Sequence, residues 1–127
     1  MNKRTVKTSK EILHNLPYEA ISVTLDANAF GKGLASAGTV LAGDGASVFK
    51  DRTKKVKPVR NAEVSGADHI DGILLTDVDL SKGDATGALV YSGTVNSDKL
   101  VDQELAKDTS TLATKLPHIV FVKGGTK

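Results

Sequence analysis

Short apolar segments separated by glycine-containing turns fill this chain from Ala20 onward. Ile21, Val23 and Leu25 alternate with small or hydroxyl-bearing residues, which is the period of a strand with one buried face. Turn sequences such as Gly-Asp-Gly at 43–45 end these segments. Many short strands joined by turns predict an antiparallel or mixed β domain rather than a layered α/β sheet.

Further strands are predicted wherever the apolar pattern returns. They lie at 39–41, 47–49, 72–78, 88–95 and 118–122. The segment after Asn96 is expected to form a helix through Leu100 and Leu105 that resumes near Leu112. The predicted fold class is therefore mainly β with one or two short helices, a β-rich α+β arrangement, built as a small β-barrel or β-tulip-like single domain.

Residues 1–19 are polar and basic and hold few large apolar side chains. Ile12 and Leu16 predict one short helical turn within this segment. A segment of this composition buries too little apolar surface to order itself, so we expect a flexible N-terminal arm. The predicted organisation is the arm at 1–19, the β-rich domain at 20–123 and a disordered tail at 124–127.

Length and composition exclude several classes of protein. A chain of 127 residues fits one domain, and its lack of cysteine excludes a disulfide framework, a thiolate metal site and a cysteine nucleophile. A net charge of +2 and an aromatic content of 4% argue against a dedicated binder of nucleic acid. No apolar run has the length of a membrane span, and no apolar stretch follows the basic start. We therefore expect no membrane and no specific nucleic acid among its partners.

Side chains that carry chemistry in other proteins are present but are not arranged for it. The three histidines are scattered along the chain, which does not predict a metal site. Asp77 and Asp79 match the first spacings of a calcium-binding loop, but Ala88 stands where that loop needs a glutamate. These acids are interpreted as strand-end and turn carboxylates. Since no phosphate-binding loop or nucleophile elbow is found either, no enzyme, cofactor or metal is predicted.

A cationic run occupies residues 50–60, with six basic residues and one acid. Three interpretations are open for this run. It forms a solvated loop, it grips phosphate groups, or it meets an acidic surface on a protein partner.

Four segments give the chain its resemblance to a known family. They are AGTVL at 37–41, DGILLTDVD at 71–79, GALVYSGTVN at 87–96 and LPHIVFV at 116–122. In these segments the chain resembles the head decoration and head-fibre proteins of tailed phages, the lambda-type capsid-stabilising family. The likeness covers about the C-terminal two-thirds of the chain.

The resemblance implies a compact β-rich fold without catalysis and a homotrimer on the threefold and quasi-threefold positions of a phage head. It also implies a structural virion protein that stabilises the shell, with the major capsid protein as its partner. The expected location is the outer surface of the capsid, after a stay in the host cytoplasm before assembly.

Two sets of residues are assigned to contacts in such an assembly. The arm is expected to add a strand to the edge of a capsid sheet. The capsid-binding residues would be Lys3, Arg4, Thr5, Val6, Lys7 and Thr8. Apolar positions left over from the core are expected to form the trimer interface at Leu100, Leu105 and Leu112. A terminus without a role is the alternative for the arm.

Two other functions are kept as alternatives. The first is a head-fibre base or a carbohydrate-binding adhesion module. It would need an aromatic platform, and aromatic residues are scarce. The second is a nucleic-acid-binding β-barrel that uses the run at 50–60 and the basic arm. It predicts an affinity for DNA that falls steeply with salt.

Overall fold

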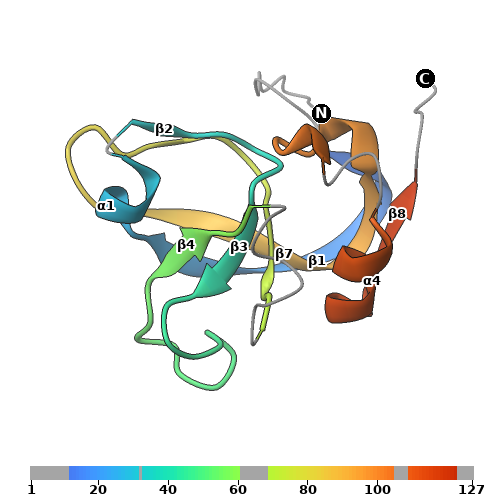
Figure 1. The fold of residues 1–127 in the computed structure, drawn as a ribbon, viewed down its shortest axis with the longest axis horizontal. Coiled ribbons are helices and arrows are strands. Elements are labelled where there is room, and N and C mark those ends of the chain that lie inside the picture. Colours follow the sequence, from blue (N-terminus) through green and yellow to red (C-terminus); the bar gives the residue numbers. More distant parts are fainter. Residues whose placement is uncertain (1–11, 32, 61–68, 105–108, 123–127) are drawn as a thin grey trace, which may run out of the picture.

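The computed structural model describes residues 12–31, 33–60, 69–104 and 109–122, without the side chains of 14–17. The strands, in chain order, are β1 (Leu13–Leu25), β2 (Leu34–Ala35), β3 (Val40–Gly43), β4 (Val56–Pro58), β5 (Gly72–Leu74), β6 (Val78–Asp79), β7 (Ala85–Asn96) and β8 (Ile119–Val122). The helices are α1 (Ala27–Phe30), the 3-10 helix η1 (Ser97–Lys99) and α4 (Ser110–Lys115). The mainly β class with short helices that the sequence predicts is confirmed (Figure 1).

The larger sheet closes on itself. Its strands follow the order β1-β4-β3-β5-β7-β8, and β1 also pairs with β7. This antiparallel pairing runs from Leu13 opposite Val95 to Leu25 opposite Ala85. Strands β1, β4, β3, β5 and β7 therefore form a ring, and β8 extends the sheet as a parallel neighbour of β7. Strands β2 and β6 form a separate two-stranded sheet, with β2 close to α1 in Figure 1.

Two clusters of buried side chains fill the fold. The first joins the end of β7 to α4 and β8 and includes Ile12, Ile73, Val95, Leu100, Leu112, Leu116 and Ile119. The second lies between the strands of the ring and includes Val23, Leu25, Leu41, Val48, Val56, Leu74, Leu80 and Leu89. Burial of these apolar groups supplies the main driving force for the fold.

Gly72 allows β5 to lie close against β7. A Cβ atom at this position would stand 2.3 Å from the carbonyl oxygen of Val90 and 2.5 Å from a methyl carbon of Leu89. Because real Cβ atoms do not approach other atoms so closely, a larger residue here would push the two strands apart. The space that a side chain at Gly72 would fill is thus taken by the backbone of Val90 and the side chain of Leu89 in β7.

The N-terminal part of β1 differs from the sequence prediction. The strand begins at Leu13, inside the range predicted as an arm, and the predicted helical turn is wrong. β7 is long enough to pair with these residues, and pairing across the sheet replaces local helix formation. Ile12 is fully buried, and its carbonyl oxygen accepts a hydrogen bond from the backbone N–H of Asn96 at 2.9 Å.

Two other predicted strands are also different in the structure. Residues 47–49 form a turn, in which the backbone N–H groups of Lys50 and Asp51 donate to the carbonyl of Ser47, both at 3.0 Å. β4, from within the cationic run, is the strand that pairs with β3 instead. The predicted strand at 72–78 is split, because β5 ends at Leu74 and β6 begins at Val78.

The predicted helix after Asn96 is only partly present. Asn96 caps η1 by accepting a hydrogen bond from the N–H of Asp98 at 3.0 Å, and η1 ends at Lys99. The helix near Leu112 is α4. Leu105 and the tail at 124–127 lie outside the described residues. Within the described part of the chain, no helix is long and apolar enough to cross a bilayer.

Candidate functional site

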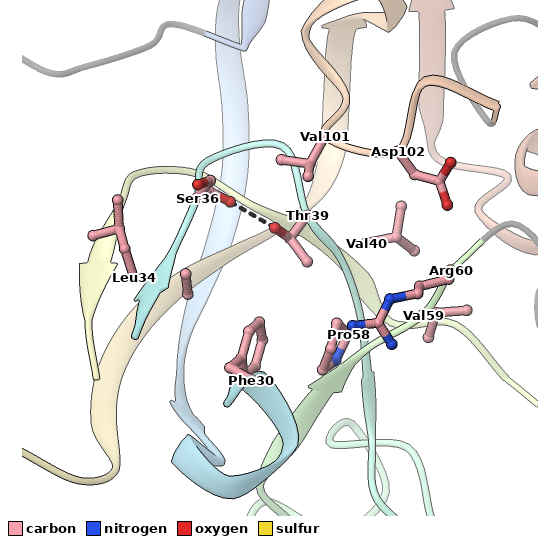
Figure 2. A pocket seen from close by; sticks show the side chains of 11 residues that line it. Phe30, Leu34, Ser36, Thr39, Val40, Pro58, Val59, Arg60, Val101 and Asp102 are labelled. Carbon is pink, nitrogen blue, oxygen red and sulfur yellow. Dashed lines mark hydrogen bonds between the residues drawn. The ribbon is translucent and has the colours of Figure 1, made fainter. Parts of the chain in front are cut away.

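An apolar hollow of about 290 Å³ opens between α1, β2, β3, β4 and the segment after η1 (Figure 2). We call it the β2 hollow. It is lined by Phe30, Leu34, Ala35, Ser36, Thr39, Val40, Pro58, Val59, Arg60, Val101 and Asp102. In Figure 2, Phe30 and Pro58 lie at one end of the hollow and Val101 lies at the other.

The position of Phe30 in the hollow follows from how α1 is capped. Asp26 accepts a hydrogen bond from the N–H of Asn28 at 3.0 Å, which starts the helix. Gly31 ends it in the left-handed region, with φ of 83°. Asp84 Oδ1 also accepts from the N–H of Ala27 at 2.8 Å, which ties α1 to the turn before β7.

The opposite wall is held by the contact between Gly38 and the chain after η1. Gly38 has φ of 94°, and a Cβ atom there would lie 2.3 Å from the carbonyl oxygen of Lys99. Its carbonyl accepts a hydrogen bond from the N–H of Val101 at 3.2 Å. Glycine is needed for both the backbone conformation and the close approach, and together they place Val101 over the hollow.

The chemistry of the β2 hollow suits packing rather than reaction. Two hydroxyl groups line it, those of Ser36 and Thr39. The hydroxyl of Thr39 donates a hydrogen bond to the backbone carbonyl of Ser36 at 2.7 Å. Its charged groups, Arg60 and Asp102, stand beside an apolar lining. A volume near 290 Å³ is at the small end of the roughly 300–1,000 Å³ that small-molecule sites span.

A second hollow, of about 370 Å³, lies beside an aromatic pair. The rings of Phe49 and Tyr91 meet edge to face, with centroids 5.2 Å apart and planes at 76°. We call this surface the Phe49 face. It is formed by Ile21, Phe49, Ile70, Asp71, Tyr91, Lys115, Leu116, Pro117 and His118.

One buried carboxylate holds the turn that carries Phe49. Asp71 Oδ2 accepts from the N–H of Gly43 at 2.8 Å and from that of Val48 at 3.1 Å. Its Oδ1 accepts from the hydroxyl of Ser47 at 2.7 Å. Three hydrogen bonds to one carboxylate fix the turn in one conformation.

The acids near β6 act as turn and strand-end carboxylates, as the sequence predicts. Asp77 Oδ1 accepts from the N–H of Ala37 at 2.7 Å, and Asp79 Oδ1 accepts from the N–H of Ser81 at 2.9 Å. The backbone and hydroxyl of Ser81 lower the pKa of Asp79. Among the described residues, no group of three or more histidines and acids could hold a metal ion.

Three cations of the run at 50–60 contact other parts of the domain. The guanidinium of Arg52 donates to the carbonyl of Ser22 at 3.0 Å. Lys55 Nζ lies 2.6 Å from a carboxylate oxygen of Asp84, which raises the pKa of Lys55. Lys57 Nζ lies 3.8 Å from Asp44. These contacts favour the interpretation of the run as a solvated structural segment.

The residues assigned to contacts from sequence fall into two groups. Residues 3–8 of the predicted capsid-binding arm and Leu105 lie outside the described residues. Leu100 and Leu112 are described, and they are 1% and 0% exposed in the single chain. Their side chains belong to its core, so their contact with a neighbouring subunit stays a prediction.

Sequence reasoning did not identify either hollow. Leu34 follows a glycine loop and Phe49 ends a predicted strand, and their exposure depends on contacts made far along the chain. Single apolar side chains in polar segments are common on protein surfaces, so the sequence alone held no signal for either hollow.

Comparison with known families finds a match over most of the chain. The family model described as bacteriophage lambda head decoration protein D matches residues 12–117, which extend from the start of β1 to the residues after α4. A search of curated proteins finds no match. The resemblance seen in the sequence is confirmed. The chain belongs to the family of the bacteriophage lambda head decoration protein D.

Proposed function

We propose that the chain binds the outer surface of a tailed-phage head as a homotrimer, at threefold and quasi-threefold positions, and stabilises the shell. The observation that carries this proposal is the family match over residues 12–117. Membership of a head decoration family makes the chain a structural protein of the phage virion. The symmetry, the stabilising effect and the outer location are the parts that we propose. Before assembly, the protein would be stored in the host cytoplasm.

The proposed capsid-binding residues precede an anchored point of the domain. Ile12 is fully buried, and its carbonyl oxygen is bonded to the N–H of Asn96. An extended segment gains about 3.3 Å per residue, so Lys3 can reach roughly 30 Å from Ile12. Residues 3–8 would therefore extend well away from the domain toward the major capsid protein.

Residues 3–8 would bind by adding a strand to a capsid sheet edge. In this mode backbone hydrogen bonds supply the affinity, and the side chains Thr5 and Val6 select the register. The entropy of ordering the segment opposes binding, so one arm alone would bind weakly.

A trimer overcomes this weakness because three arms engage equivalent sites together. Effective concentration at the second and third sites raises the overall avidity by about 10²–10⁴-fold over one arm. Each trimer then bridges several capsid subunits, and these contacts must break together before the shell opens. Stabilisation follows from that linkage.

The test is deletion of residues 2–11, which stops short of buried Ile12. Wild-type and truncated protein are mixed with purified expanded heads of the phage that encodes the chain, and bound protein is measured after sedimentation. We expect the truncated protein to keep its native mass and to lose at least about 100-fold in affinity, because all three arms are removed. A matched variant lacking residues 124–127 should bind as the wild type does.

Two results would contradict the proposal in different ways. A truncated trimer that binds heads with wild-type affinity would show that the arm has no role. A wild-type protein that binds neither unexpanded nor expanded heads would reject decoration itself.

A further inference from the structure

We propose that the bond between Asp44 and Gly45 is a site of spontaneous isomerisation, at which the folded protein converts Asp44 into isoaspartate as it ages. The inference goes beyond the proposed function and needs neither a partner nor a second copy of the chain. The sequence contains two Asp-Gly pairs, at 44–45 and at 71–72. Both pairs have the same chemistry, so the fold decides which of them reacts.

The reaction joins a backbone nitrogen to the side chain of the preceding residue. The nitrogen of the glycine attacks Cγ of the protonated aspartate, an N–Cγ bond forms, and the N–H proton and the carboxyl hydroxyl leave as water. Water then opens the succinimide ring. Opening at Cγ restores aspartate, whereas opening at the main-chain carbonyl leaves the glycine nitrogen bonded to Cγ, which is isoaspartate. Glycine favours ring closure because it has no Cβ atom to obstruct the attack.

The carboxyl group of Asp44 is free to rotate toward the main chain. Its side chain is 63% exposed. Within the described part of the chain, its one polar contact is the ion pair with Lys57, at 3.8 Å. A long ion pair on the surface restrains a side chain little. The electrophilic carbon of the reaction is therefore available.

The attacking nitrogen of Gly45 is accessible as well. Residues 44–46 form a bend in the loop between β3 and β4, which projects from the ring at the bottom of Figure 1. A Cβ atom added to Gly45 would meet only Lys54 Nζ, at 3.9 Å, so the space around this residue is open. Among the described residues, none accepts a hydrogen bond from the N–H of Gly45. Water can therefore reach both the nitrogen and the ring.

The second pair, Asp71 and Gly72, is protected by the fold. Asp71 is 4% exposed, and its carboxylate accepts hydrogen bonds from Gly43, Ser47 and Val48. Rotation of this carboxylate toward the nitrogen of Gly72 would break these three bonds. Gly72 also lies in β5, between β3 and β7. We therefore expect this pair to react only when the domain unfolds.

Isomerisation of Asp44 would alter a bend that is fixed at both ends. The N–H of Gly43 donates to Asp71 before the bend, and Ser47 and Val48 donate to the same carboxylate after it. The bend is also tight, because a Cβ atom at Gly43 would lie 2.2 Å from the carbonyl oxygen of Ala46. Isoaspartate adds one carbon atom to the main chain between these fixed points. We therefore expect the isomerised protein to unfold at a lower temperature.

Such a slow change matters for a protein of the phage virion. The family match makes this chain a structural protein of the head. A head protein is synthesised before assembly, and a released particle does not replace its subunits. Isomerised copies would therefore accumulate with the age of the particle.

The test compares the two pairs within one chain. Full-length protein is incubated near neutral pH, either folded or in concentrated urea, until both pairs have isomerised in urea. Peptide mapping separates the aspartate and isoaspartate forms, which have the same mass, and an isoaspartate methyltransferase labels only the second form. We expect similar rates at the two pairs in urea. In the folded protein, Asp71 should react at least about 100-fold more slowly than Asp44, because less than roughly 10⁻³ of a native population is unfolded.

Asp44→Glu is the matched variant for the effect on stability. Glutamate keeps the negative charge, but ring closure from its longer side chain is much slower. We expect the thermal midpoint of the wild type to fall as isoaspartate accumulates at position 44. The midpoint of Asp44→Glu should stay constant over the same incubation. Circular dichroism follows both proteins and shows that the variant is folded at the start.

Three results would overturn parts of this inference. If Asp44 stays intact in the folded protein while it reacts in urea, the bend protects it and the proposed site is wrong. Equal rates at the two pairs in the folded protein would show that the fold does not select between them. An equal fall in midpoint for wild type and Asp44→Glu would reject the proposed effect of isoaspartate on the bend.

Discussion

The hydroxyl of Ser47 donates a hydrogen bond of 2.7 Å to the carboxylate of Asp71, a side chain that is only 4% exposed. The same carboxylate accepts two backbone N–H groups, from Gly43 and Val48. His69 lies on the other side of this turn, with Nε2 2.8 Å from the carbonyl oxygen of Gly43. Polar contacts around one buried acid thus hold the exposed ring of Phe49 in a defined place.

Two replacements of Asp71 should distinguish the loss of its charge from the loss of its hydrogen bonds. In Asp71→Asn, the amide oxygen can keep both backbone bonds, and the amide nitrogen can donate to Ser47. In Asp71→Ala, two buried N–H groups lose their acceptor, at about 1–3 kcal/mol each. We expect Asp71→Ala to lower the free energy of unfolding by at least about 2 kcal/mol and Asp71→Asn to lower it by clearly less. Urea denaturation measures both, and equal losses would show that charge, rather than hydrogen bonding, is what matters.

Substitution of Gly72 should separate β5 from β7. Gly72→Ala places a methyl group against the carbonyl of Val90, and we expect a loss of about 1–3 kcal/mol in the free energy of unfolding. Gly33→Ala is the matched control, because nothing lies within 4 Å of its added Cβ. Thermal unfolding compares the two variants. A Gly72→Ala protein as stable as the Gly33→Ala protein would contradict the close packing of the strands.

Substitution of Leu112 should show whether this residue stabilises the core of the single chain or the predicted trimer interface. Its side chain is fully buried in the single chain, so Leu112→Ala should cost about 2–5 kcal/mol in the free energy of unfolding. Val120→Ala, at an exposed position, should change it by less than about 0.5 kcal/mol. Denaturant unfolding and native mass are measured together. A changed oligomer mass with unchanged stability would support the predicted place of Leu112 in the trimer interface.

The pKa values of two exposed acids depend on different donors. The hydroxyl of Thr53 is the main cause that lowers the pKa of Asp51, and its backbone N–H is the second. For Asp79 the order is reversed, with the backbone N–H of Ser81 first. Thr53→Ala should therefore raise the pKa of Asp51 by removing its main lowering cause, whereas in Ser81→Ala the main cause for Asp79, the backbone N–H, is kept. Carboxyl-carbon NMR titration follows both acids, and an unchanged pKa of Asp51 in Thr53→Ala would contradict this geometry.

The sign of the effect on stability follows from the direction of these shifts. The pKa of Asp51 is lower in the folded state than its ordinary value of 3.8, so its ionised form favours folding. This contribution is present above that ordinary value and is lost as the pH falls through the folded-state pKa. The difference in stability between wild type and Thr53→Ala should therefore shrink on acidification.

Much of the fold could be predicted from local patterns. The alternation at 21–25 matches β1, where Val23 and Leu25 are buried and Thr24 is exposed. The strand predicted at 88–95 lies within β7, and that predicted at 118–122 contains β8. In these segments burial follows the sequence pattern itself, so period and composition were sufficient.

The errors arise where distant partners decide the structure. The start of β1 is polar, and only its pairing with β7 makes it a strand. β4 has a single buried side chain, Val56, which lies between two lysines. The charged sequence therefore does not show the pattern of a strand. Residues 47–49 have a strand-like composition, but Asp71 holds them in a turn from more than twenty positions away.

The candidate site was harder to predict than the fold. A hollow depends on how several elements meet, and no residue of the β2 hollow is chemically unusual. The burial of Leu100 and Leu112 likewise depends on α4 and β8, which the apolar pattern alone does not place. Sequence periodicity indicates which side chains are buried. It does not indicate whether they are buried within their own chain or in an interface with a neighbouring chain.

The ring of strands also constrains how the protein is synthesised. β1 leaves the ribosome first, but apart from a single parallel bridge between Leu25 and Val56 its partner in the sheet is β7. Contacts that span so much of the chain form late and slowly. A nascent chain that stops before residue 85 holds four strands of the ring without the one that closes it. In that state the edge of β1 that β7 covers would be open, and such an edge is a site where unfinished copies would pair with each other.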